Sequence, residues 1–67
     1  MTVQMMADAA YYASRQTAAK GGTNRDRALL LDAIDADCKA AKLDTRTVLA
    51  EVELRWLYDT IATYQES

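Results

Sequence analysis

The sequence predicts an all-α protein built from three helices, and two observations support that prediction. The 67 residues include thirteen alanines and no proline, a composition that favours helices. Apolar residues recur at intervals of three and four along most of the chain, which is the period of an amphipathic helix. We expect helices at about 2–20, 24–42 and 45–65, which together form a single small helical domain over residues 1–67.

The first helix, about 2–20, ends at the only two glycines of the chain, Gly21 and Gly22. Glycine tolerates the left-handed conformation that commonly terminates a helix. Two apolar stripes run along this helix, so it has more than one side available for packing. One contains Val3, Met6, Ala10, Ala13 and Thr17, and the other contains Met5, Ala9, Tyr12 and Ala19.

The second helix, about 24–42, begins after Thr23, which we expect to cap it together with Asp26. Its apolar residues follow the spacing of a coiled-coil seam, and Asp35 and Lys39 form an i,i+4 ion pair on the opposite side. The seam consists of Leu31, Ile34, Cys38 and Ala41. With no histidine to activate the thiol, we expect Cys38 to be a small buried apolar residue.

The third helix, about 45–65, begins after Asp44, a residue type that caps helices well. One apolar seam contains Ala50, Leu54, Leu57, Ile61 and Tyr64, and a second strip contains Leu49, Val52 and Trp56. Glu51, Arg55 and Asp59 form a charged ladder with i,i+4 spacing beside the seam.

Helices two and three are expected to pack as an antiparallel hairpin with their seams facing each other. Each then keeps one further apolar strip, and the first helix can cover only one of them. A chain this short buries only about 60% of its unfolded surface, so its stability is marginal without help. One cysteine excludes an intramolecular disulfide. We therefore expect a homodimer, in which a second chain covers the remaining strip.

Several classes of function lack the residues they need. Without histidine there is no ordinary zinc or haem site and no histidine-based catalytic triad. The acidic run Asp32, Asp35 and Asp37 is interpreted as a solvated helix face paired with lysines, not as a metal site. We expect no enzyme activity, no cofactor and no metal. The chain has no membrane-length apolar run and no signal-peptide pattern, which predicts a cytoplasmic protein.

The leading functional hypothesis is a small protein-binding regulator, inhibitor or adaptor that occludes a surface of a larger protein. Short, acidic helical proteins of phages and mobile elements offer an analogy for this role. The expected contact residues are Leu49, Val52 and Trp56, joined by Tyr11 and Tyr12, because aromatic residues often dominate binding energy. The acidic surface of the second and third helices is expected to steer binding toward a basic patch.

The alternative hypothesis is a dimeric nucleic-acid-binding regulator. It would use either the basic stretch 15–27, with Arg15, Lys20, Arg25 and Arg27, or the turn near 41–48, which resembles that of a helix-turn-helix unit and has Arg46 as a reader. Residues 1–30 carry a net charge of +2, whereas residues 31–67 carry −4. The total of −2 argues against a strongly basic nucleic-acid-binding domain.

Overall fold

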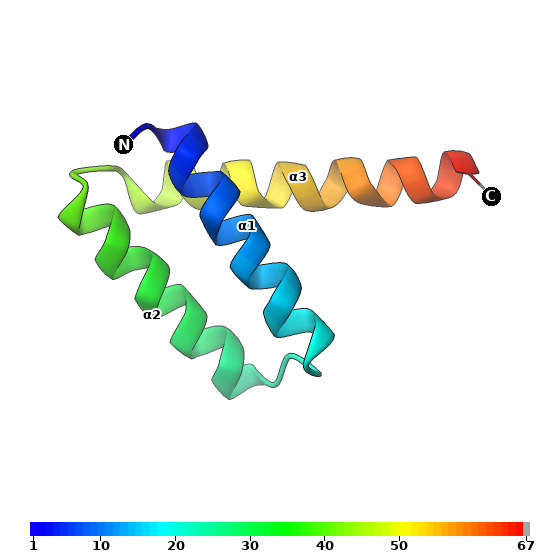
Figure 1. Cartoon of the computed structure of the whole chain (residues 1–67), viewed down its shortest axis with the longest axis horizontal. Helices are drawn as coiled ribbons and strands as arrows, with labels where there is room; N and C mark the ends of the chain where they lie inside the picture. The colour runs from blue at the N-terminus through cyan, green and yellow to red at the C-terminus, as the bar shows by residue number, and fades with distance from the viewer. Residues whose placement is uncertain (67) are drawn as a thin grey trace.

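A computed structural model describes residues 1–66 and the side chains through Gln65. It contains α1 (Val3–Ala19), α2 (Asn24–Ala40) and α3 (Thr45–Glu66), and no strand within this part of the chain. The all-α class and the number of helices are confirmed, with each boundary within two residues of its expected position. The molecule measures 41 × 26 × 14 Å, because α3 extends well past the other two helices (Figure 1).

A side-chain cap begins each helix, and those of Thr23 and Asp44 were predicted from the sequence. Thr2 and Thr23 each accept a backbone hydrogen bond from the residue three positions later, at 3.2 and 3.1 Å between Oγ1 and N. The Asp44 Oδ2 accepts from the backbone N–H and the hydroxyl of Thr47, at 3.0 and 2.8 Å. Both bonds favour the ionised carboxylate, so they lower the pKa of Asp44. The prediction of Asp44 as an N-cap is therefore confirmed.

The turns that end α1 and α2 differ in the residue type at the left-handed position. After α1 the chain passes through Gly21 and Gly22, with φ angles of 108° and 52° that glycine adopts at little cost. After α2 the left-handed position is occupied by Lys42, with φ 60°. Around it, the Leu43 N–H donates to the Cys38 carbonyl (2.8 Å) and the Lys42 N–H to the Lys39 carbonyl (3.1 Å). This is the Schellman pattern, which usually has glycine at the left-handed position.

The buried core is small and draws two or three residues from each helix. Cys38 and Val48 are its largest fully buried side chains, which confirms the prediction for Cys38. Two alanines of α1 belong to it, and their small size lets the α1 backbone approach α3 closely. The core residues are Met6, Ala7, Ala10, Ile34, Cys38, Val48 and Val52.

The expected pairing of the α2 and α3 seams is not observed. Leu54, Leu57 and Ile61 of the α3 seam are exposed, and so is Leu31 of the α2 seam. The core uses the other side of α3, which carries Val48 and Val52. In Figure 1, α2 and α3 diverge from their short link and α1 crosses over the first half of α3. The hairpin prediction was wrong about which strip of α3 faces inward.

Polar contacts hold α1 onto this inward side of α3. The Arg55 guanidinium pairs with Asp8 of α1 at 2.9 Å and donates to the Gln4 side chain at 2.9 Å. Farther along, Arg15 of α1 pairs with Asp59 at 2.8 Å. The predicted ladder of Glu51, Arg55 and Asp59 therefore does not run wholly along α3. Only the Glu51–Arg55 pair, at 3.6 Å, lies within α3, whereas Asp59 pairs with α1.

Candidate protein-binding groove

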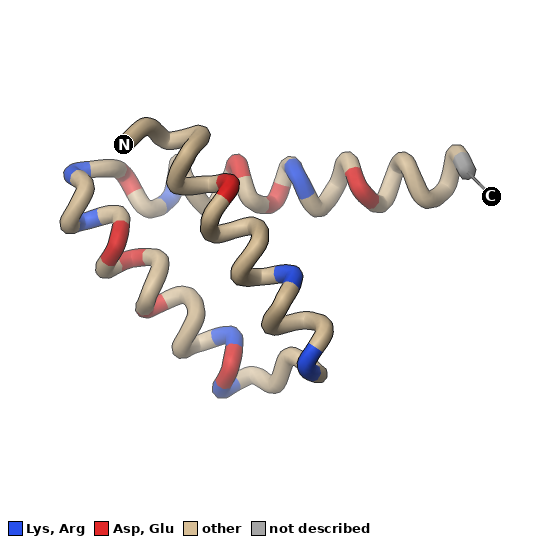
Figure 2. Tube along the Cα trace, viewed as in Figure 1, with Lys and Arg blue, Asp and Glu red and all other residues tan. Residues whose placement is uncertain are grey.

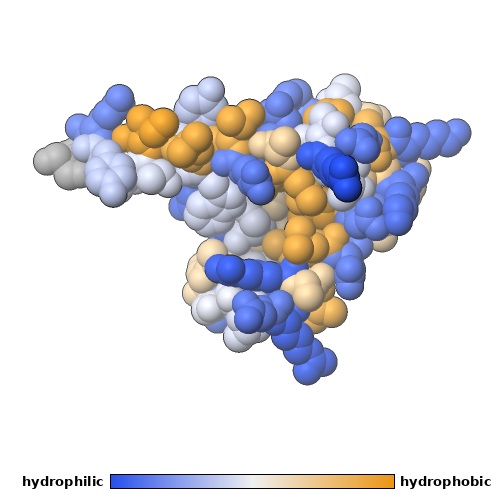
Figure 3. Space-filling model, turned by 180° about the vertical axis from the view of Figure 1, so that it is seen from behind, coloured by the Kyte–Doolittle hydropathy of each residue, from blue (hydrophilic) through white to orange (hydrophobic). Residues whose placement is uncertain are grey.

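The divergence of α2 and α3 leaves an apolar groove between them. Its volume is about 370 Å³. Its walls carry six large apolar side chains: Leu30, Leu31 and Ile34 from α2, and Leu49, Val52 and Trp56 from α3. We refer to this feature as the α2–α3 groove. Figure 3 shows apolar surface in the angle between the two helices.

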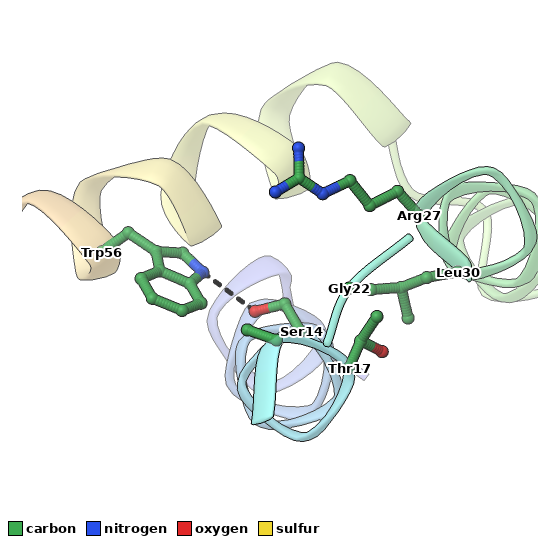
Figure 4. A pocket seen from close by; sticks show the side chains of 7 residues that line it. Ser14, Thr17, Gly22, Arg27, Leu30 and Trp56 are labelled. Carbon is green, nitrogen blue, oxygen red and sulfur yellow. Dashed lines mark hydrogen bonds between the residues drawn. The ribbon is translucent and has the colours of Figure 1, made fainter. Parts of the chain in front are cut away.

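Trp56 forms one end of the groove and is held in a fixed position by α1. Its Nε1–H donates to the Ser14 Oγ at 2.9 Å (Figure 4). The Tyr11 ring meets the indole edge to face, with 5.9 Å between ring centroids, and the Arg15 guanidinium lies 5.4 Å from the indole centroid. Tyr11 in turn donates its hydroxyl hydrogen to Asp59. The indole is thus a rigid, half-buried wall.

Two charged side chains of opposite sign line the groove, Arg27 of α2 and Glu53 of α3. Figure 4 shows the Arg27 side chain reaching from α2 toward α3. Neither forms an ion pair or a side-chain hydrogen bond with the residues whose side chains are described. The groove therefore combines an apolar floor with one cation and one anion available to a ligand.

The groove continues past Trp56 toward the turn between α1 and α2. This adjoining hollow has a volume of about 390 Å³ and shares Ser14, Arg27, Leu30 and Trp56 with the groove. Thr17, Ala18 and Gly22 complete its lining, and Figure 4 labels Thr17 and Gly22 among them. The two hollows therefore adjoin each other at these four shared residues.

The five residues expected to contact a partner have different environments. The α2–α3 groove is lined by Leu49, Val52 and Trp56. Of these, Val52 is buried and also belongs to the core. Tyr11 packs behind Trp56 against the core. Tyr12 is exposed on α1 and is not among the groove residues. The structure therefore brings three of the five together in the groove, with Tyr11 in contact behind Trp56, and places only Tyr12 apart from them.

Three features of the groove were not predicted from the sequence. From the sequence, Ile34 is expected only in a helix seam and Arg27 only in nucleic-acid binding, and neither Leu30 nor Glu53 is expected to contact a partner. Val48, a core residue, was missed as well. Its position four residues before Val52 is the signal that places it on the same side of α3.

The two alternative sites of the nucleic-acid hypothesis lie in different parts of the structure. Lys20, Arg25 and Arg27 flank the turn between α1 and α2, whereas Arg46 lies in the first turn of α3 (Figure 2). The 17 residues of α2 separate these positions, a length of about 25 Å. Arg15 is neutralised by Asp59. The two alternative sites therefore do not join into one basic track.

Of the acidic run of α2, Asp35 is engaged in side-chain contacts. Asp35 pairs with Lys39 at 2.8 Å and accepts a hydrogen bond from Thr45 at 2.7 Å. The bond from Lys39, followed by that from Thr45, lowers the pKa of Asp35. Among the described residues no cluster of three or more cysteine, aspartate or glutamate side chains is arranged to hold a metal ion. In the same part of the chain, none of the helices has the length and apolar character needed to cross a membrane.

Comparison of the chain with models of protein families, with curated proteins and with solved structures finds no match.

Proposed function

We propose that this protein is a small protein-binding regulator that holds an amphipathic helix of a larger protein in the α2–α3 groove and thereby occludes that helix. The observation that carries the proposal is the apolar groove with unpaired charges, Arg27 and Glu53, among its lining residues. A groove between diverging helices is a common receptor for the apolar face of a peptide helix.

The lining of the groove defines the chemistry of the occupant. Apolar side chains at positions i, i+3 or i+4, and i+7 of the bound helix would contact Leu31, Leu49 and Trp56. A carboxylate at one edge of that helix would pair with Arg27, and a lysine or arginine at the other edge would pair with Glu53. The acidic side chains of α2 and α3 add attraction for a basic partner surface (Figure 2).

The fixed indole supports binding at this site. Trp56 is already ordered by Ser14, Tyr11 and Arg15, so little conformational entropy is lost there when a ligand binds. Binding through the groove needs no catalytic group, and the single thiol, Cys38, is buried in the core.

Site-directed photo-crosslinking in the native host tests this proposal. A photoreactive phenylalanine analogue replaces Leu31, which lines the groove and is 49% exposed. The matched control places it at Leu29, which is 58% exposed on the same helix but is not among the groove residues. Peptide mass spectrometry of each adduct then identifies the partner segment.

We expect an adduct at position 31 that is absent at position 29 and that maps to an amphipathic helix of one larger protein. The substitution Arg27→Glu should weaken this adduct several-fold, because it places a carboxylate where the partner's acidic side chain binds. Equal labelling from both positions would contradict the proposal. An adduct at position 31 with a lipid or another small apolar molecule, instead of a protein, would contradict it too.

A further inference from the structure

The outer face of α3 is a second apolar surface, distinct from the α2–α3 groove. It consists of Ala50, Leu54, Leu57, Ile61 and Tyr64, and its three aliphatic side chains Leu54, Leu57 and Ile61 are 44%, 54% and 43% exposed. Ile61 follows the core residue Val52 by nine residues, or two and a half turns, so it points away from the core. Figure 3 shows a row of apolar side chains along the projecting part of α3.

We propose that this outer face pairs with the same face of a second copy of the chain, with the two α3 helices antiparallel. The five positions are spaced by four, three, four and three residues, which is the repeat of a two-helix coiled coil. They extend seven residues to either side of Leu57. A two-fold axis near Leu57 therefore brings the two seams opposite each other to within one residue, as a symmetric dimer requires.

The projecting part of α3 needs tertiary support to remain helical. Past Asp59, where α1 makes its last ion pair with α3, the sequence contains Thr60, Ile61 and Thr63, all weak helix formers. A short helical segment of this composition is unstable in water unless its apolar side packs against something. In Figure 1 this segment extends beyond both α1 and α2. A second α3 laid along the outer face supplies the missing packing.

The charges beside the seam favour a second copy in antiparallel orientation. Glu51 and Glu53 flank the seam near its start, whereas Tyr58, Thr60 and Gln65 flank its later part. A parallel pair would gather four carboxylates at one end. In an antiparallel pair, each copy's glutamates lie beside uncharged residues of the other, and the opposed helix dipoles also attract.

The pairing also keeps the rest of each chain accessible. The antiparallel arrangement places the two α1–α2 units at opposite ends of the paired helices. The outer face and the groove lie on different sides of α3. Because consecutive residues of a helix are 100° apart, Glu53 lies between the groove and the outer face. The dimer therefore does not depend on the function proposed for the groove.

The mass of the protein in solution tests the dimer. Light scattering during gel filtration should give twice the 7.4 kDa chain mass for the wild type and for Leu29→Glu, an exposed site on α2. Leu57→Glu should give the mass of one chain, because it places a carboxylate at the two-fold axis. A wild-type monomer, or a Leu57→Glu dimer, would overturn the proposal. Arg27→Glu should remain a dimer while weakening the adduct at position 31, so the two proposals can fail separately.

Disulfide formation between two cysteine variants tests the orientation without destabilising charges. In an antiparallel pair Leu54 of one copy lies near Ile61 of the other, so a mixture of Leu54→Cys and Ile61→Cys chains should form mostly mixed disulfides. The native Cys38 is buried and does not compete. Predominant Leu54→Cys homodimers alongside Ile61→Cys homodimers would indicate parallel pairing, and the absence of any disulfide would refute the interface.

Discussion

Replacing Lys42 with glycine should stabilise the protein. Lys42 adopts φ 60° at the end of α2, a conformation that costs a residue with a side chain about 1–2 kcal/mol. Glycine removes this cost but gains freedom in the unfolded chain worth about 0.5–1 kcal/mol. The difference is a net gain of about 0.5–1 kcal/mol. For a domain of this size, that gain raises the midpoint of thermal unfolding by about 2–8 °C.

Circular dichroism melts at one fixed protein concentration measure this effect, because the stability of a dimer depends on concentration. Lys42→Ala is the matched control, since it removes the same charged side chain but keeps the strained backbone. We expect the control to melt within about 2 °C of the wild type, a change below about 0.5 kcal/mol. If Lys42→Gly melts no higher than Lys42→Ala, the left-handed strain at this turn is refuted.

Two further predictions concern the helix cap and the core. The folded structure lowers the pKa of Asp44 below its usual 3.8. The stability that this cap contributes is therefore present above pH 3.8 and is lost as the pH falls through the pKa of Asp44 in the folded protein. Asp44→Asn should thus flatten the dependence of the melting midpoint on acid pH. An unchanged acid profile would contradict this. Ile34→Val should lower the free energy of unfolding in urea by about 0.5–1.5 kcal/mol, whereas Leu29→Ala at an exposed site should change it by less than about 0.5 kcal/mol. Equal losses would show that Ile34 is not a core residue.

The sequence was sufficient to locate the helices because their ends are determined locally. Thr23 and Asp44 accept hydrogen bonds from residues three positions away, and Gly21 and Gly22 adopt positive φ angles. Each of these signals can be read within a few residues. The burial of Cys38 followed from its place among apolar residues at helical spacing.

The inward side of α3 could not be chosen from the sequence because the contacts that select it are long-range. Helical spacing identified two apolar strips, and the larger one, with Leu54 and Leu57, was assigned to the core. The structure instead packs Val48 and Val52 inward. The small Ala7 and Ala10 of α1 leave room for a close helix crossing.

The polar contacts that fix this crossing join residues far apart along the chain. Arg55 pairs with Asp8, and Arg15 pairs with Asp59, across separations of more than forty residues. No periodicity within one helix contains that information. The same limit applies to the candidate site, since the groove exists only because α2 and α3 diverge and thereby bring Arg27 of one and Glu53 of the other to the same depression.

Hydrogen exchange along α3 is the most direct test of whether this helix carries two apolar faces, one closed by α1 and α2 and the other by a second copy. In the wild type, we expect slow amide exchange both at 48–56 and at 60–65. In Leu57→Glu, exchange at 60–65 should approach the rate of an unfolded chain, whereas 48–56 should remain protected by the core. Equally slow exchange at 60–65 in both proteins would contradict the requirement for a second copy.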